Sequence, residues 1–174
     1  APATAVQLLA NGTALGVTAL PASGALCGAP AQLLITPPAG GQPSAREHAW
    51  QGIDAVTLTN GSVRAVFARA TGRLLSFTLG EREYIDAGRP GDGANRFVVH
   101  NDRPLFWDAW DVDVFHLEQF RTIDAVESFR VLESSGAVRA SIQFVFRVSD
   151  KSTVTQTIHM HCAAVQPALV FECD

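Results

Sequence analysis

A regular alternation of apolar and polar residues over positions 138–162 most restricts what this chain can fold into. Successive side chains of a β-strand point to opposite faces, so an alternation of period two predicts strands with one buried face each. The segment Asp150-Lys151-Ser152 interrupts the alternation and predicts a turn between two antiparallel strands. The positions predicted to be buried are Val138, Ala140, Ile142, Phe144, Phe146 and Val148 before the turn, and Val154, Ile158, Met160 and Cys162 after it.

The same pattern recurs earlier in the chain. The pair Asn60-Gly61 predicts a tight turn before a strand in which Val63, Ala65 and Phe67 share a face. A second turn at 70–72 leads into a strand over 73–79, with Leu75, Phe77 and Leu79 on one face, and residues 122–132 predict another strand. Since no segment shows a convincing helical period, we expect an all-β fold, an antiparallel β-sandwich whose two sheets each bury one face.

Composition predicts how the chain is divided. Residues 1–52 are rich in Ala, Gly and Pro, so we expect a strand-poor lead-in there, with a connector over 37–46 and a boundary near residue 52. Residues 53–174 are expected to form the β-sandwich domain. The chain ends at Phe171-Glu172-Cys173-Asp174, within a predicted strand, so we expect this domain to be incomplete at its C-terminus.

Charge, hydropathy and cysteine content exclude several classes of protein. The net charge of -4 argues against a nucleic-acid partner, which favours a basic surface. No apolar run approaches the ~18 residues of a membrane-spanning helix. The three cysteines Cys27, Cys162 and Cys173 fit no zinc motif and cannot all pair internally, so we expect free thiols in a reducing compartment.

The run over residues 95–118 is rich in residues whose side chains are suited to binding or catalysis. Trp107 and Trp110 are interleaved there with Asp108, Asp111 and Asp113. A tryptophan face suits the apolar face of a sugar ring, and a carboxylate accepts hydrogen bonds from sugar hydroxyls. The run is therefore a candidate carbohydrate contact.

Four segments of this chain resemble the β-region of the α-mannosidases of glycoside hydrolase family 38. They are Thr57–Arg64, Thr71–Ser76, Gly93–Val98 and Asp102–Val112, which contains Trp107-Asp108-Ala109-Trp110-Asp111-Val112 and is followed in register by Phe115-His116-Leu117-Glu118. The resemblance is strong from Val56 to Glu118 and weaker as far as Asp174, and it is closest to the cytosolic and vacuolar branch. It covers only the start of that β-region, whose fold resembles part of a galactose-mutarotase-like supersandwich.

The resemblance implies a retaining glycosidase that hydrolyses terminal α-linked mannose of oligomannose glycans. In that family an N-terminal α/β domain carries the aspartate nucleophile and the ligands of a zinc or cobalt ion, and a helical bundle follows. This chain shows none of those motifs, so we assign it no catalytic residue and no metal ligand. We expect its partners to be the catalytic and helical domains and the glycan, its compartment to be the cytoplasm or alternatively a vacuole or lysosome, and the isolated chain to be inactive.

For the candidate substrate-binding residues Trp107, Asp108, Trp110 and Asp111, two interpretations remain open. They line the rim of the mannose site, or the two aspartates brace a loop by accepting backbone N–H bonds, which is the favoured interpretation of the carboxylates. Catalysis by them is disfavoured, because nothing in the sequence predicts a raised pKa. His159 and His161 are expected to be surface residues, and His100 and His116 structural ones.

Three alternatives to the α-mannosidase interpretation stay open. One is a stand-alone carbohydrate-binding module that uses Trp107 and Trp110 as its platform. Another is a mutarotase-like epimerase, for which His116 with Asp111 is the candidate pair. The third is a purely structural β-domain of a larger assembly.

Overall fold

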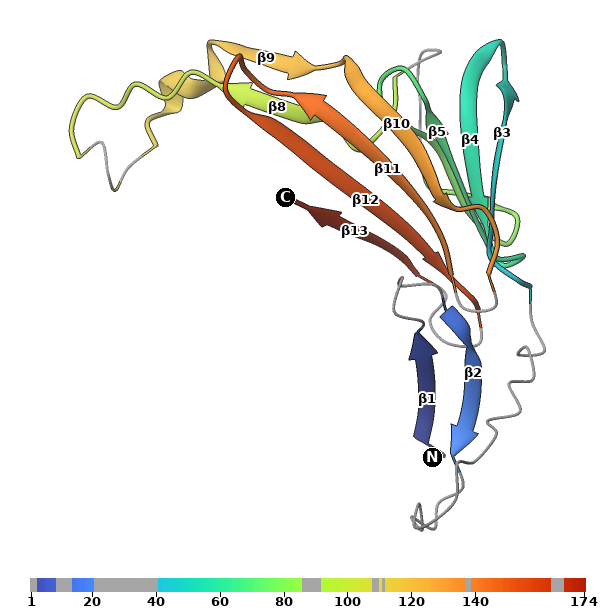
Figure 1. The fold of residues 1–174 in the computed structure, drawn as a ribbon. Coiled ribbons are helices and arrows are strands. Elements are labelled where there is room, and N and C mark those ends of the chain that lie inside the picture. The colour runs from blue at the N-terminus through green and yellow to red at the C-terminus, as the bar shows by residue number, and fades with distance from the viewer. Residues whose placement is uncertain are drawn as a thin grey trace.

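The computed structural model describes residues 3–8, 14–20, 41–85, 92–107, 110, 112–136, 139–163 and 168–174. These residues form antiparallel β-strands, loops and one short 3-10 turn, Val114–Leu117 (η1). A five-stranded and a four-stranded sheet bury their facing sides against one another (Figure 1). The prediction of an all-β antiparallel sandwich is therefore confirmed. The described part of the chain has no helix long and apolar enough to cross a membrane.

The first sheet has the strand order β3-β4-β5-β6-β7. Its strands are β3 (Ser44–Trp50), β4 (Ile53–Thr59), β5 (Val63–Ala68), β6 (Leu74–Leu79) and β7 (Arg82–Glu83). The turn between β4 and β5 is set by Asn60, whose side-chain oxygen accepts the N–H groups of Ser62 and Val63 at 3.1 and 2.8 Å. The Asn60 amide nitrogen then donates to the His161 carbonyl at 2.8 Å, so this turn also ties the first sheet to the second.

The second sheet has the order β10-β11-β12-β13. Its strands are β10 (Val126–Glu133), β11 (Arg139–Arg147), β12 (Thr153–His161) and β13 (Leu169–Cys173). β11 and β12 pair without a register shift from Arg139↔His161 to Arg147↔Thr153, which confirms the predicted hairpin and its turn at 150–152. Of the positions predicted to be buried in it, Val138 lies outside the described residues.

The core lies between the two sheets. The rings of Phe67 on β5 and Phe144 on β11 lie 6.2 Å apart, and Phe97 packs on Phe146 at 4.9 Å. Alternation placed Phe67, Phe144 and Phe146 correctly, because burying one face of each sheet is the main apolar gain available to a sandwich. The fully enclosed residues from the predicted faces are Val63, Ala65, Phe67, Ala140, Ile142, Phe144, Phe146, Ile158 and Met160.

Two local predictions differ from the structure. β6 begins at Leu74, and a register shift against β5 between Val66 and Phe67 puts Leu74 into the core cluster where alternation predicted Leu75. The single strand predicted over 122–132 is two strands, β9 (Phe120–Ile123) and β10, separated at 124–125. In both places one or two residues break the period, which hydropathy alone does not mark.

The lead-in over residues 1–52 contains more strand than its composition predicts. β1 (Ala3–Leu8) and β2 (Ala14–Leu20) pair antiparallel, and β3 pairs with β4 along its whole length. The first large sheet therefore begins at Ser44, upstream of the boundary predicted near residue 52 and inside the predicted connector. β3 carries little apolar signal because its face away from the core bears Ser44, Arg46 and His48.

Candidate functional site

The most distinctive part of the surface is a projecting arm, residues 101–119. It leaves the sandwich after β8 (Phe97–His100) and returns into β9, and these two strands form a ladder of their own. The Asn101 N–H donates to the Gln119 carbonyl at 2.9 Å, and the Asn101 side-chain amide donates to Gln119 Oε1 at 2.9 Å. The arm thus begins and ends at one point and extends away from both sheets (Figure 1).

Local hydrogen bonds shape the arm. Trp107 has a left-handed backbone with φ of 57°, and its carbonyl accepts the Trp110 N–H at 2.7 Å. The carboxylate of Asp113 accepts the Leu105 N–H at 2.8 Å, so it joins two stretches eight residues apart. Asp113 therefore makes the bracing contact that the sequence predicted for the neighbouring aspartates.

The four predicted site residues have different outcomes. Trp107 and Trp110 lie on the arm and expose 76% and 90% of their surfaces. Asp108 and Asp111 lie outside the described residues. Both tryptophans are thus available to another molecule, and their contact with a sugar stays a prediction.

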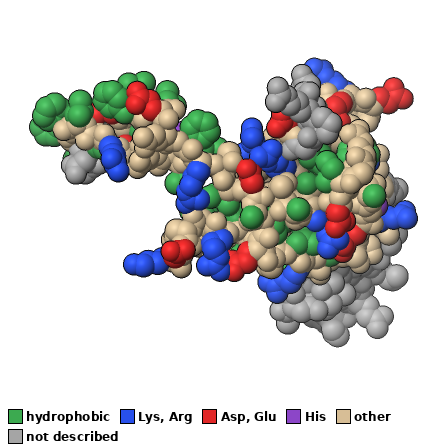
Figure 2. Space-filling model, turned by 90° about the horizontal axis from the view of Figure 1, so that it is seen from above, with side chains coloured by type: hydrophobic (Ala, Val, Ile, Leu, Met, Phe, Trp, Pro, Cys, Tyr) green, Lys and Arg blue, Asp and Glu red, His purple; other side chains and the backbone are tan. Residues whose placement is uncertain are grey.

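Apolar side chains gather on the arm to an extent seen nowhere else on the face in Figure 2. Seven of them are more than half exposed: Leu105, Phe106, Trp107, Trp110, Val112, Val114 and Leu117. Contiguous exposed apolar surface is costly in water and is typical of an interaction site. The arm is therefore a surface suited to being covered by another protein surface or a ligand.

Two histidines hold the base of the arm. His100 Nδ1 lies 3.1 Å from the His116 carbonyl, and His116 Nδ1 lies 2.7 Å from the Asp113 carbonyl. A carbonyl only accepts hydrogen bonds, so each Nδ1 carries a proton and donates it. These contacts fit the structural role predicted for both. They also engage Nδ1 of His116. Asp111, the partner of His116 in the epimerase alternative, lies outside the described residues.

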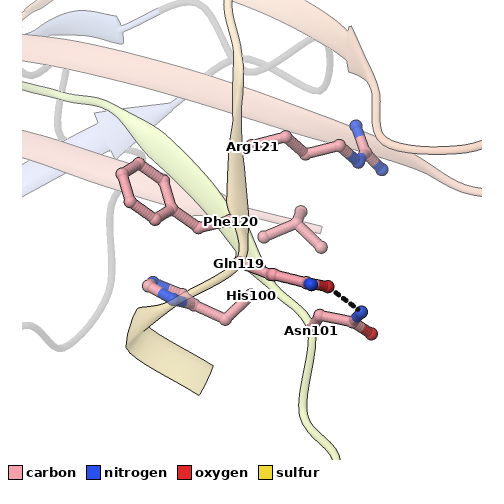
Figure 3. A pocket seen from close by; sticks show the side chains of 6 residues that line it. His100, Asn101, Gln119, Phe120 and Arg121 are labelled. Carbon is pink, nitrogen blue, oxygen red and sulfur yellow. Dashed lines mark hydrogen bonds between the residues drawn. The ribbon is translucent and has the colours of Figure 1, made fainter. Parts of the chain in front are cut away.

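A cavity of ≈310 Å³ opens beside these histidines. Figure 3 shows its lining, with His100 and Phe120 on one side of the ladder and the bonded pair Asn101 and Gln119 on the other. A smaller cavity of ≈130 Å³ shares that pair and adds Arg103, Phe115 and Glu118. Sequence reasoning missed Asn101 and Gln119, since only the pairing of β8 with β9 brings them together.

The prediction that both histidines of β12 lie at the surface is wrong for His159. His159 is buried, although the sequence predicted a surface residue, and its ring stacks on that of the half-buried His161 at 6.3 Å. Burial lowers the pKa of His161, and the neighbouring His159 and Arg139 lower it further. Within the described residues no three His, Cys, Asp or Glu side chains are placed to hold a metal ion, so they do not fit the zinc or cobalt centre that the family resemblance implies.

One polar cluster has the order of a nucleophile, a base and an acid. Ser141 Oγ lies 2.7 Å from His159 Nδ1, and His159 Nε2 lies 3.4 Å from a Glu172 oxygen. Ser141 is 1% exposed and also contacts Glu133 Oε2 at 3.0 Å. A hydroxyl enclosed in this way has no approach for a substrate, so the cluster stabilises the outer face of the second sheet.

These features define a class of protein: an all-β domain with a projecting apolar arm. The family model for the glycosyl hydrolases family 38 C-terminal domain matches residues 58–174, which is more than half of the chain. The chain therefore belongs to this family of α-mannosidases, and the resemblance found in the sequence is confirmed.

Individual relatives agree with this membership. The chain is 29% identical to alpha-mannosidase of Saccharomyces cerevisiae over 126 residues, which are 70% of this chain and 11% of the relative. It is 38% identical to alpha-mannosidase 2C1 of Homo sapiens over 105 residues, 59% of this chain and 10% of the relative. Alpha-mannosidase G of Dictyostelium discoideum is 28% identical over 115 residues, 64% of this chain and 9% of the relative. The chain spans about a tenth of the length of the curated relatives it matches.

Proposed function

We propose that this chain is part of the β-region of an α-mannosidase that hydrolyses terminal α-linked mannose of oligomannose glycans with retention of configuration. Membership of the family supports the proposal, as do the names of the relatives, which are all alpha-mannosidases. A retaining glycosidase needs two carboxyl groups about 5–5.5 Å apart. By the family resemblance, the nucleophile and the zinc or cobalt ion belong to the N-terminal domain, so the isolated chain is inactive.

The contribution of this chain is to scaffold the enzyme through the arm. The observation that carries this proposal is the set of seven apolar side chains, each more than half exposed, on a segment braced at its base. Covering one large aromatic side chain contributes about 1.5–3 kcal/mol, so several together suffice to fix one domain against another. The occupant that we propose for the arm is the catalytic and helical part of the enzyme.

Trp107 and Trp110 of the arm, with Asp108 and Asp111 next to them in the sequence, are proposed to line the rim of the mannose site. The exposure of the two tryptophans supports this placement, because a sugar stacks on an open indole face. Hydroxyl groups of the sugar would then donate to the aspartate carboxylates. These contacts position the glycan, and the bond-breaking groups come from the other domain.

The test compares variants of the full-length α-mannosidase that contains this chain. Trp110→Ala should raise KM or lower kcat on an aryl α-mannoside. The matched control is Leu132→Ala, an exposed apolar residue on β10 away from the arm, which should leave both constants unchanged. Unaltered kinetics of a folded Trp110→Ala enzyme would contradict a place at the substrate rim.

Docking of the arm is tested separately with Phe106→Glu. This charge should lower the melting temperature of the full-length enzyme, because the arm could no longer be covered, and should leave that of the isolated chain unchanged, since Phe106 is 75% exposed there. Equal melting temperatures of the two full-length enzymes would reject the docking role.

The exposure of Trp107 and Trp110 also favours the stand-alone carbohydrate-binding module as a second candidate. That function predicts saturable binding of an oligomannose glycan by this chain alone, abolished by Trp107→Ala. Heat of binding that is indistinguishable from buffer dilution would leave the scaffold function.

We further propose the cytoplasm as the compartment, with a vacuole or lysosome as the alternative. Cys162 and Cys173 are both free thiols, which agrees with a reducing environment. Cell fractionation of the native protein distinguishes the two: recovery with vacuolar or lysosomal markers would overturn the cytoplasmic proposal.

A further inference from the structure

A polar cavity of ≈400 Å³ lies far from the arm, on the face of the first sheet that is turned away from the core. It is lined by Ser44, Arg46, His48, Thr57, Thr59 and Arg64. These residues come from β3, β4 and β5, which are adjacent strands. Neither the scaffold role nor the arm uses this face.

The strands curl around this cavity. In the register of the sheet Trp50 pairs with Ile53, whereas Arg64 pairs with Thr59, six residues further along β4. A flat sheet would separate these two positions by about 20 Å. The Arg64 guanidinium nevertheless lies 4.4 Å from the centroid of the Trp50 ring, so the sheet is coiled and this face is concave.

The cavity has an excess of positive charge. Neither Arg46 nor Arg64 has a carboxylate partner among the described residues, and none of the described lining residues is acidic. By contrast, Arg69, Arg73, Arg139 and Arg147 each form an ion pair with a carboxylate. Two guanidinium groups that line one concave site repel each other, and an anion between them would remove that cost.

Internal hydrogen bonds use the donors of His48, Thr57 and Thr59, which also line the cavity. His48 Nδ1 lies 2.9 Å from the Ala49 carbonyl, so this nitrogen is the one that donates. His48 Nε2 then accepts the Thr57 hydroxyl proton at 2.6 Å. The Thr59 hydroxyl donates to the Val63 carbonyl at 2.8 Å, which leaves Ser44 and the two arginines as the lining donors without an acceptor among the described residues.

We propose that this cavity binds an oxyanion of the phosphate class, held by Arg46 and Arg64. A guanidinium presents parallel N–H donors that match two oxygens of a phosphate group, and Ser44 supplies a third direction. The Trp50 ring fixes the Arg64 plane from one side, which preorganises one half of the site. Free phosphate and the phosphate of a sugar ester share this chemistry.

The experiment is isothermal titration calorimetry of the full chain with sodium phosphate, with glucose 6-phosphate and with glucose. We expect saturable binding of the first two, and at least a tenfold loss of affinity in Arg46→Gln and in Arg64→Gln, since each removes a charge-assisted contact. The matched control is Arg82→Gln, whose guanidinium also lies over an aromatic ring, Tyr84, at 4.9 Å, but outside the cavity. Its phosphate affinity should equal that of the parent chain.

Each outcome of these titrations either supports the proposed phosphate site or overturns it. Tighter binding of glucose 6-phosphate than of phosphate assigns the site to a sugar ester, and equal binding assigns it to the free ion. No saturable heat with either phosphate compound, or glucose binding as well as glucose 6-phosphate, overturns the proposal. Affinity for phosphate that stays within twofold in both arginine variants also overturns it. Arg46 is exposed, so Arg46→Gln keeps the test decisive even if Arg64→Gln fails to fold.

Discussion

The side-chain amides of Asn95 and Gln156 donate hydrogen bonds to each other at 2.8 and 3.0 Å, across 61 residues of sequence. Asn95 Nδ2 also donates to the Gly72 carbonyl at 2.8 Å, and the Asn95 backbone is left-handed with φ of 58°. One side chain therefore ties the turn before β6, the segment before β8 and the strand β12 together. Two of the four family-like segments meet at this point, which gives them a structural role.

Removal of this link should destabilise the fold. Asn95→Ala leaves Oε1 of Gln156, which is 3% exposed, without its donor, and it replaces asparagine, which tolerates a left-handed backbone, by alanine, which tolerates it less well. We expect the free energy of unfolding to fall by about 1–3 kcal/mol in urea titrations. Asn101→Ala is the control, because its side-chain bond to Gln119 is exposed, and it should cost about 0.5 kcal/mol or less. Equal losses for both variants would contradict the role of the Asn95 link.

Gly72 should tolerate no side chain. Its φ is 66°, and a β-carbon there would lie 2.4 Å from Cζ of the buried Phe146 ring. Gly72→Ala therefore adds overpacking of about 1–3 kcal/mol to the left-handed cost of about 1–2 kcal/mol. Gly80→Ala has a similar φ of 58° with nothing within 4 Å, so it should show the backbone cost alone. Thermal unfolding of the two variants should separate them clearly, and matching melting temperatures would argue against the contact with Phe146.

Removing an aromatic ring should destabilise the isolated chain strongly in the core and hardly at all on the arm. Phe144 is fully buried between the sheets, so Phe144→Ala should lower the free energy of unfolding of the chain by about 3–5 kcal/mol. Phe106→Ala removes a ring that is 75% exposed and should change it by less than about 0.5 kcal/mol. A large loss from Phe106→Ala in the isolated chain would mean that the arm is already covered by the chain itself.

The stacked pair His159 and His161 predicts a pH dependence of stability. The pKa of His161 in the folded chain lies below its ordinary value of 6.5, first because of burial and then because of His159 and Arg139. As the pH falls below about 6.5, His161 becomes protonated in the unfolded chain but stays neutral in the folded chain. The free energy of unfolding therefore falls until the pH reaches the pKa of His161 in the folded chain. His161→Gln should remove this part of the decline. Urea titrations at pH 7.5 and 5.5 measure it, and an identical decline in the variant and the parent chain would contradict it.

The strands of this protein follow from local sequence where the alternation is long and apolar. The hairpin of β11 and β12 and the strand β5 were predictable with their buried faces, because period two and a buried face specify each other. Asn60-Gly61 marked its turn for the same kind of local reason, since glycine adopts the φ of 85° found there at little cost.

Other parts of the fold and the candidate site had no local signal. The alternating face of β3 bears Arg46 and His48, so its polar composition resembled that of a connector until β4 paired with it. Trp107 and Trp110 were noticed from residue type and from their family-like segment, but their exposure depends on where the arm leaves the β8–β9 ladder. The cavity of Arg46 and Arg64 required the coiling of a whole sheet.

The sequence by itself determined the strands with a long apolar alternation, which side of each of them is apolar, and the family to which the chain belongs. Only the tertiary structure decided that Asn95 meets Gln156, that Gly72 lies under Phe146, and that the arm stands clear of both sheets. The physical reason is that strand formation and facing depend on neighbours within a few residues. Those later contacts depend on the register and packing of strands that are distant in sequence, which no local pattern encodes.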